Sequence, residues 1–182
     1  RGQLDETLIV FASDHGSHFR TRNLEYKRSA HDASIRIPLI LAGPGFRGGE
    51  RRSDLATNLD LLPTLVTVAG GADPERDGRS LQSASGAPED VLVQISESHI
   101  GRALRTHTHT YAARAPTKQP IAGHLRPAAE RYVGTHLFDN ITDPHQRRNL
   151  INDPASSALR DTLAVRLAGR IQQVEGSRPV VS

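Results

Sequence analysis

One short stretch near the start of the chain constrains its fold more than any other. Residues 8–12 read LIVFA, an apolar run, and residues 14–16 follow it as DHG. Such a run predicts a buried strand, and in open α/β sheets ligands bind just beyond the carboxyl ends of the strands. Because an adjacent carboxylate and imidazole can reach one cation, Asp14 and His15 are candidate metal ligands. An ordinary strand end, in which Asp14 only caps a loop, is the alternative for this stretch by itself.

Composition limits the classes of protein to which the chain can belong. Its 182 residues, 36% hydrophobic and 24% charged, suit a globular protein, and no apolar run reaches the roughly 18 residues of a membrane span. The absence of Cys excludes disulfides, thiolate catalysis and Cys-based zinc sites. The net charge is only +3 and the arginines are scattered, so no nucleic-acid interface is indicated. Nothing in the sequence indicates a compartment or an oligomeric state.

The first part of the chain alternates apolar runs with turn residues. Strands are expected at residues 6–12 and 35–42, and Pro38 favours an edge position or a strand start for the second. A helix is expected at residues 58–69, because apolar side chains recur there at helical spacing. These elements predict an α/β portion over residues 1–85.

The pattern of apolar and turn residues changes in the second part of the chain. Short apolar runs with turn residues between them predict an antiparallel sheet, with strands at residues 91–95, 103–106, 108–113 and 136–139. A final helix is expected to begin with Asp153 as its cap and Pro154 in its first turn. Its buried stripe is expected to comprise Leu159, Leu163, Leu167, Ile171 and Val174. These elements predict a smaller α+β portion over residues 86–182.

A polar loop over residues 13–32 is too long for a simple connection, and loops of this length are usually functional or disordered. Lys27 lies in it and is the only lysine of the first 117 residues. A compact ammonium in an arginine-rich chain suggests a position that needs a point charge, for instance beside an oxyanion. An ordinary surface lysine is the alternative.

Histidines form the other group of candidates. His31 and Asp32 stand together and can act as an acid/base pair or orient each other. His18 and the nearby loop arginines are interpreted as solvated residues, with anion contacts as the alternative. His107 and His109 would share one face of a strand, where a half-exposed surface is preferred over a second metal site.

Several blocks, in order along the chain, resemble the sulfatase family of the alkaline-phosphatase superfamily. Residues 5–16 resemble the segment D-T-L-[IV]-[IV]-F-T-S-D-[HN]-G, and residues 26–40 resemble K-x-x-x-[YH]-E-x-S-x-R-[VI]-P-L. Further resemblances to family motifs lie at residues 43–45, 58–65, 78–81, 101–106 and 137–150. The order of these blocks is more specific than any one of them. The fold implied is the C-terminal part of the α/β sulfatase sandwich over residues 1–85, followed by an α+β subdomain with antiparallel strands and a C-terminal helix.

The resemblance implies roles for individual residues. It implies that Asp14 and His15 bind a divalent metal, with Ca²⁺ preferred and Mn²⁺ or Zn²⁺ as alternatives because His replaces the commoner Asn. It implies that Lys27 contacts the sulfate ester and stabilises its leaving oxygen. His31 is carried over as a catalytic and substrate-binding pocket residue, and Arg105, within a matching block, as a substrate-binding residue.

One departure from the family bears directly on activity. Sulfatases use a formylglycine made from Cys or Ser within C/S-x-P-x-R, and two further metal-binding Asp residues lie earlier still. This chain has no Cys and no S-x-P-x-R segment. We therefore expect it to be the C-terminal half of such an enzyme, with little or no turnover by itself.

The function expected from this resemblance is metal-dependent hydrolysis of a sulfuric ester, on a sulfated small molecule or glycan. A phosphonate or phosphate ester hydrolase of the same superfamily is the alternative among enzymes, because the nucleophile that would separate the two is absent. A non-catalytic remnant that binds anions or sulfated glycans is the alternative outside enzymes. No nucleic acid and no membrane span are expected.

Overall fold

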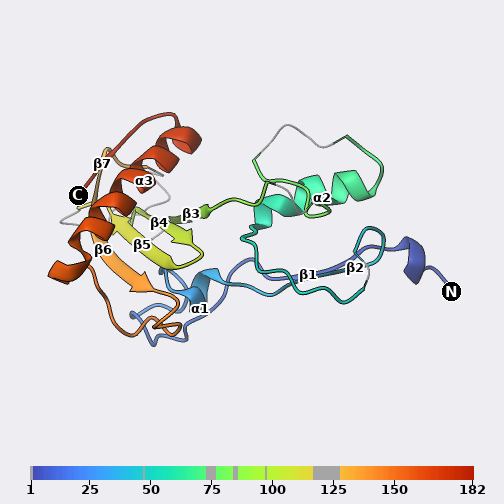
Figure 1. The fold of residues 1–182 in the computed structure, drawn as a ribbon, viewed down its shortest axis with the longest axis horizontal. Helices are drawn as coiled ribbons and strands as arrows, with labels where there is room; N and C mark the ends of the chain where they lie inside the picture. Colours follow the sequence, from blue (N-terminus) through green and yellow to red (C-terminus); the bar gives the residue numbers. More distant parts are fainter. Residues whose placement is uncertain (1, 47, 73–76, 84–85, 97, 117–127) are drawn as a thin grey trace. The chain divides into compact units, whose positions relative to one another are not determined.

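The protein is described by a computed structural model, in which its contacts form two compact units (Figure 1). The residues described are 2–46, 48–72, 77–83, 86–96, 98–116 and 128–182. The first unit comprises Arg1–His15 and Ile37–Val91, and the second comprises Gly16–Arg36 and Leu92–Ser182. The long polar loop therefore folds with the later part of the chain. None of the helices in the described residues is both long and apolar enough to cross a membrane.

The first unit contains a two-stranded antiparallel sheet of β1 (Ile9–Ala12) and β2 (Leu39–Ala42). A short 3₁₀ turn, η1 (Leu4–Glu6), precedes β1. The second strand was expected to begin at residue 35, and this was wrong. It begins only after Pro38, which lacks the N–H that a strand ladder requires.

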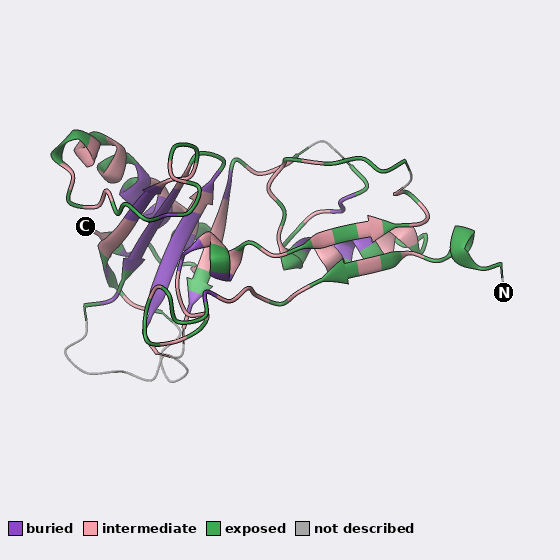
Figure 2. Cartoon of the chain, turned by 90° about the horizontal axis from the view of Figure 1, so that it is seen from below, coloured by how far each residue is buried: buried purple, intermediate pink, exposed green. Residues whose placement is uncertain are grey.

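Side chains of β1 are more exposed than the sequence predicted. Ile9 is 48% exposed and Phe11 is 60% exposed, so the expectation of a buried strand was wrong (Figure 2). Among the described residues β1 is paired only with β2, and a two-stranded ribbon cannot bury both of its faces.

The predicted helix of the first unit is confirmed as η2 (Asn58–Asp60) followed by α2 (Leu61–Val68). A capping box begins it: the Thr57 hydroxyl accepts the Leu59 N–H at 3.1 Å, and Asp60 Oδ2 accepts the Thr57 N–H at 2.8 Å. Asp60 also accepts the Arg79 N–H at 2.9 Å and is 4% exposed. Its carboxylate therefore has a structural role.

The second unit is built on a five-stranded sheet with the order β3-β4-β5-β6-β7. The strands are β3 (Asp90–Ile95), β4 (Gly101–Thr106), β5 (His109–Arg114), β6 (Arg131–Asp139) and β7 (Val180–Val181). The pairs β4/β5 and β5/β6 are antiparallel, as predicted, whereas β6 and β7 are parallel. The two-residue β7 was not predicted.

One long helix covers this sheet (Figure 1). Asp153 accepts the Ala155 N–H at 3.0 Å, η3 (Pro154–Ser156) and α3 (Ser157–Glu175) follow, and Gly176 ends the helix at φ 79°. The shared core comprises Leu104, Tyr111, Leu137, Leu163, Leu167 and Ile171, among others. Val174, placed in the buried stripe by the sequence, is 55% exposed. The expected α+β subdomain with its C-terminal helix is confirmed.

Candidate active site

The two halves of the predicted site belong to different units. Asp14 and His15 end the first stretch of the first unit, whereas Lys27, His31 and Arg105 belong to the second. The geometry of each group is therefore established within its own unit.

Asp14 and His15 lie at a turn just after β1. Asn58 holds this turn, because its Nδ2 donates to the carbonyls of Ser13 and Asp14 at 3.3 and 3.2 Å. The Asp14 carboxylate accepts the His15 N–H at 2.9 Å, and Asp14 Oδ2 lies 3.4 Å from His15 Nε2. The carboxylate and the imidazole thus lie side by side, and whether they bind one ion together stays a prediction.

The donor chemistry of this pair suits a divalent cation but forms only part of a coordination shell. One carboxylate oxygen and one imidazole nitrogen would be contributed, whereas Ca²⁺ takes 6–8 oxygen ligands. No group of three or more His, Cys, Asp or Glu side chains in the described residues could hold a metal. Any metal bound by Asp14 and His15 therefore needs further ligands, such as amide or carbonyl oxygens, waters or groups outside the described residues.

Gly16 connects this turn to the second unit's own loop. Its N–H donates to the Ser34 carbonyl at 2.8 Å, and a Cβ at this position would lie 2.2 Å from the Ala33 carbonyl oxygen. Only a residue without a side chain fits against the short helix α1 (Asp32–Ile35) at this distance. The glycine of the DHG sequence is thus explained by packing.

Lys27 lies in the loop that precedes α1. Its Nζ lies 5.6 Å from the centroid of the Tyr26 ring, within the range of a cation–π interaction. Its carbonyl accepts the Ser29 N–H at 2.7 Å. Whether Lys27 contacts a substrate stays a prediction.

His31, just before α1, is 7% exposed and belongs to a cluster of rings. Its ring centroid lies 5.0 Å from that of Phe138, 5.5 Å from that of His136 and 6.5 Å from that of His18. Burial, and then the neighbouring His136 and Arg22, lower the pKa of His31 to about 4. The imidazole is therefore neutral near pH 7.

His18 was interpreted as a solvated loop residue, and this was wrong. It is 2% exposed, and neither of its ring nitrogens has a hydrogen-bond partner within the described residues. Burial lowers its pKa as well. The long loop is therefore packed onto the sheet through its histidines.

Asp32 and Arg105 form a bidentate ion pair between α1 and β4. Arg105 Nε lies 2.9 Å from Asp32 Oδ1, and Arg105 Nη2 lies 3.0 Å from Asp32 Oδ2. The remaining guanidinium nitrogen donates to the Thr106 carbonyl. In this arrangement Arg105 holds Asp32, and direct contact of Arg105 with a substrate stays a prediction.

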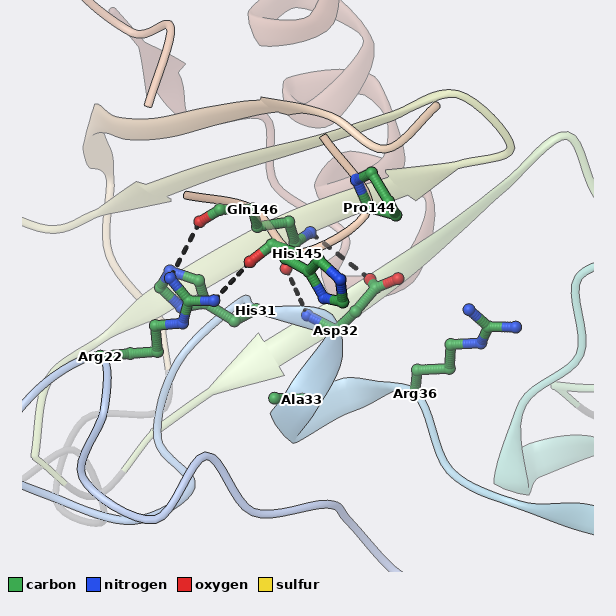
Figure 3. A pocket seen from close by; sticks show the side chains of 8 residues that line it. All are labelled: Arg22, His31, Asp32, Ala33, Arg36, Pro144, His145 and Gln146. Carbon is green, nitrogen blue, oxygen red and sulfur yellow. Dashed lines mark hydrogen bonds between the residues drawn. The ribbon is translucent and has the colours of Figure 1, made fainter. Parts of the chain in front are cut away.

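A pocket of about 280 Å³ opens beside α1 (Figure 3). Its lining comprises Arg22, His31, Asp32, Ala33, Arg36, Pro144, His145 and Gln146. Arg22 donates to the carbonyls of Gln146, at 3.1 Å, and of His145. With the Asp32 carboxylate paired to Arg105, the two lining arginines leave the pocket with a positive charge.

Sequence reasoning identified part of this pocket and missed part of it. His31 and Asp32 were candidates, and the structure brings them together in one wall. Gln146 was not singled out, nor was His136, which contacts the His31 ring but does not line the pocket. Gln146 lies inside the matching block of residues 137–150, but no local chemical pattern marked it. His107 lies in the turn before β5, so it does not share a strand with His109.

Comparisons with known proteins agree on one protein family. Residues 1–72 match the family model described as Sulfatase. The multifunctional alkaline phosphatase superfamily protein PehA of Trinickia caryophylli is 30% identical, over 96% of this chain and 36% of its own length. The choline-sulfatase of Rhizobium meliloti (strain 1021) is 32% identical, over 88% of this chain and 30% of its own length.

A solved structure agrees with these sequence matches. BT1596, a 2-O GAG sulfatase, is 26% identical with a TM-score of 0.73, covering 94% of this chain and 37% of its own. The chain thus spans about a third of the length of the relatives it matches, at 36% and 30%. The family match includes the segments that carry Asp14, His15, Lys27 and His31. The chain therefore belongs to the sulfatase family of the alkaline-phosphatase superfamily.

Proposed function

We propose that this chain forms part of a metal-dependent sulfuric ester hydrolase, and that the pocket beside α1 receives the sulfated end of its substrate. The observation that carries the proposal is the charge of that pocket. Arg22 and Arg36 line it, and the only carboxylate that the described residues place in its wall, that of Asp32, is paired with Arg105. A cavity with this balance favours an anionic group such as a sulfate monoester.

The second unit's residues have distinct roles in this proposal. Lys27 supplies a compact positive charge that stabilises the oxygen leaving the ester. His31 presents a neutral imidazole to the pocket, and its buried Nδ1 has no hydrogen-bond partner within the described residues. This nitrogen can accept a proton or a hydrogen bond from a bound substrate. Arg105 keeps Asp32 in place and acts on the substrate through it.

Asp14 and His15 are the residues that would hold the metal in the first unit. A divalent cation, when bound, would polarise the ester oxygen and offset the charge that develops on it. The support for this assignment is the 3.4 Å approach of Asp14 Oδ2 to His15 Nε2 and the position of both residues within the family match.

The substrate class is tested by hydrolysis with the complete gene product that contains these residues. We expect nitrophenyl sulfate to be cleaved with a higher kcat/KM than nitrophenyl phosphate or a phenylphosphonate monoester. Preference for phosphate or phosphonate would favour the other branch of the superfamily. Binding of sulfated glycans without any turnover would favour a non-catalytic role.

The metal assignment has its own test. Asp14→Ala is expected to lower the metal content of the purified protein and to abolish hydrolysis, because it removes the only carboxylate of the pair. Asp161→Ala is the matched control, since Asp161 lies on α3 with a 71% exposed side chain. Elemental analysis by mass spectrometry measures both variants. An unchanged metal content in the Asp14 variant contradicts the assignment.

A further inference from the structure

Helix α1 begins without the cap that helices usually have. Its N-cap residue is His31, with extended backbone angles (φ −72°, ψ 143°) and no side-chain cap hydrogen bond within the described residues. The first N–H groups of a helix have no intrahelical partner and need an acceptor. The Asp32 N–H finds one in Gln146 Oε1, at 2.6 Å and 114 positions away in the sequence.

Gln146 is itself fixed by its surroundings. It is 3% exposed, and its Nε2 donates to Asn140 Oδ1 at 2.9 Å and to Thr110 Oγ1 at 3.2 Å. The same Nε2 lies 3.5 Å from Asp32 Oδ1, so the one amide contacts both the backbone and the carboxylate of Asp32 (Figure 3). The side chain therefore joins the start of α1 to β5 and to the turn after β6.

The backbone at Gln146 also shows that its position is enforced. Its φ is 51°, a left-handed conformation that costs a residue with a side chain about 1 kcal/mol or more and persists only where neighbours over-determine it. Arg22 is such a neighbour, because it donates to the Gln146 carbonyl at 3.1 Å. The strained turn places the amide against α1.

We propose that Gln146 is a positioning residue that supplies the missing cap of α1 and thereby fixes His31 and Asp32 in the wall of the pocket. The effect on catalysis rests on the function proposed above, whereas the capping bond does not. The essential atom is the oxygen that accepts the Asp32 N–H. A Met keeps the length of the side chain but lacks that oxygen, an Asn has it one methylene too short, and an Ala lacks both the oxygen and the length.

The test uses the 182-residue chain and four variants: Gln146→Ala, Gln146→Asn, Gln146→Met and, as a matched control, Gln173→Ala on the exposed face of α3. Amide hydrogen exchange of Asp32 is followed by NMR, together with that of Tyr111 and Leu137 in the core. The imidazole of His31 is titrated in the Gln146→Ala and Gln173→Ala variants. Gln146→Met fills the space of the glutamine side chain without the accepting oxygen, and it therefore separates the capping bond from general damage to the fold.

We expect the Asp32 amide to exchange at least about tenfold faster in Gln146→Ala and Gln146→Asn, because local opening exposes it. Gln146→Met is expected to speed the exchange of the Asp32 amide as Gln146→Ala does, whereas Gln173→Ala is expected to keep the protection of the starting protein. The pKa of His31 is expected to rise from about 4 towards 6.5 in Gln146→Ala, because a loosened turn admits water. Should Gln146→Ala lose the protection of Tyr111 and Leu137, the exchange of the Asp32 amide in Gln146→Met, which leaves no empty space, decides.

Unchanged exchange of the Asp32 amide in both the Ala and the Asn variants would overturn the proposal, as would unchanged exchange in the Met variant. An unmoved pKa of His31 in a folded Ala variant would also overturn it. None of these measurements requires a substrate. A failure to hydrolyse sulfate esters would therefore refute the proposed function and leave the capping bond standing.

Discussion

Removal of the Arg105 guanidinium tests whether the ion pair with Asp32 holds α1 on the sheet. Two charge-assisted hydrogen bonds are lost, each contributing about 1.5–3 kcal/mol, and breaking one partner of a buried pair costs about 3–5 kcal/mol. The two side chains are 17% and 16% exposed, so water partly solvates the carboxylate left behind. We therefore expect Arg105→Ala to lower the free energy of unfolding of the second unit by about 2–3 kcal/mol.

The tyrosines allow this loss to be measured in the second unit alone. The chain has three tyrosines and no tryptophan, and Tyr26, Tyr111 and Tyr132 all belong to that unit. Urea unfolding followed by tyrosine fluorescence gives the free energy directly. Arg148→Ala is the matched control, because the Arg148 side chain is 76% exposed and its pair with Asp153 is expected to contribute less than about 1 kcal/mol.

A double-mutant cycle with Asp32→Asn separates the pair from other effects of the substitution. The coupling energy between Arg105 and Asp32 is expected to be about 2 kcal/mol, since residues in one ion pair are not additive. A loss in Arg105→Ala no larger than that in Arg148→Ala would refute the reasoning. A coupling energy near zero would do the same.

Two further predictions concern packing and pH. Gly16→Ala is expected to destabilise the second unit by more than about 2 kcal/mol, because its Cβ would meet the Ala33 carbonyl. Gly169→Ala, with open space in α3, is expected to stabilise it by about 0.5–1 kcal/mol. Urea unfolding of both variants checks this, and equal effects would contradict it. The pKa of His31 is lowered to about 4 when folded, so the unfolded chain binds the proton first as pH falls below about 6.5. The free energy of unfolding is therefore expected to fall between pH 6.5 and 4, by up to about 3 kcal/mol from His31. His31→Asn should flatten this dependence of the free energy on pH. An unchanged dependence in that variant would contradict the prediction.

Local signals predicted those elements of the fold that depend on local sequence. Asp153 and Pro154 mark the start of the final helix, and the structure confirms that start. The predicted start of the second strand at residue 35 was wrong because Ile35 is the last residue of α1. This four-residue helix is held by contacts that are distant in sequence. The predicted burial of β1 was wrong for a related reason. Burial depends on which elements cover a strand and not on the strand's own apolar run.

The candidate site shows the same division. Asp14 and His15 are neighbours in sequence, so their proximity could be inferred from the residues alone. The expected pairing of His31 with Asp32 was wrong, because the Asp32 carboxylate forms its ion pair with Arg105, 73 positions away. The place of Gln146 could not be inferred, because the Asp32 N–H that it accepts lies 114 positions away. The burial of His18 likewise depends on packing of the loop against the sheet, which a polar and arginine-rich composition does not reveal.

The central claim is that the loop before α1 contributes to sulfate ester hydrolysis, and Lys27 tests it most directly. In the complete gene product, Lys27→Ala is expected to lower kcat for nitrophenyl sulfate by about 10²–10³-fold, the cost of removing one group that stabilises a developing oxyanion. Lys27→Arg should recover only part of this, because a guanidinium fork does not reproduce a compact point charge. Arg20→Ala, an exposed cation of the same loop, should leave kcat unchanged. A Lys27→Ala variant with the kcat of the starting protein would contradict the account.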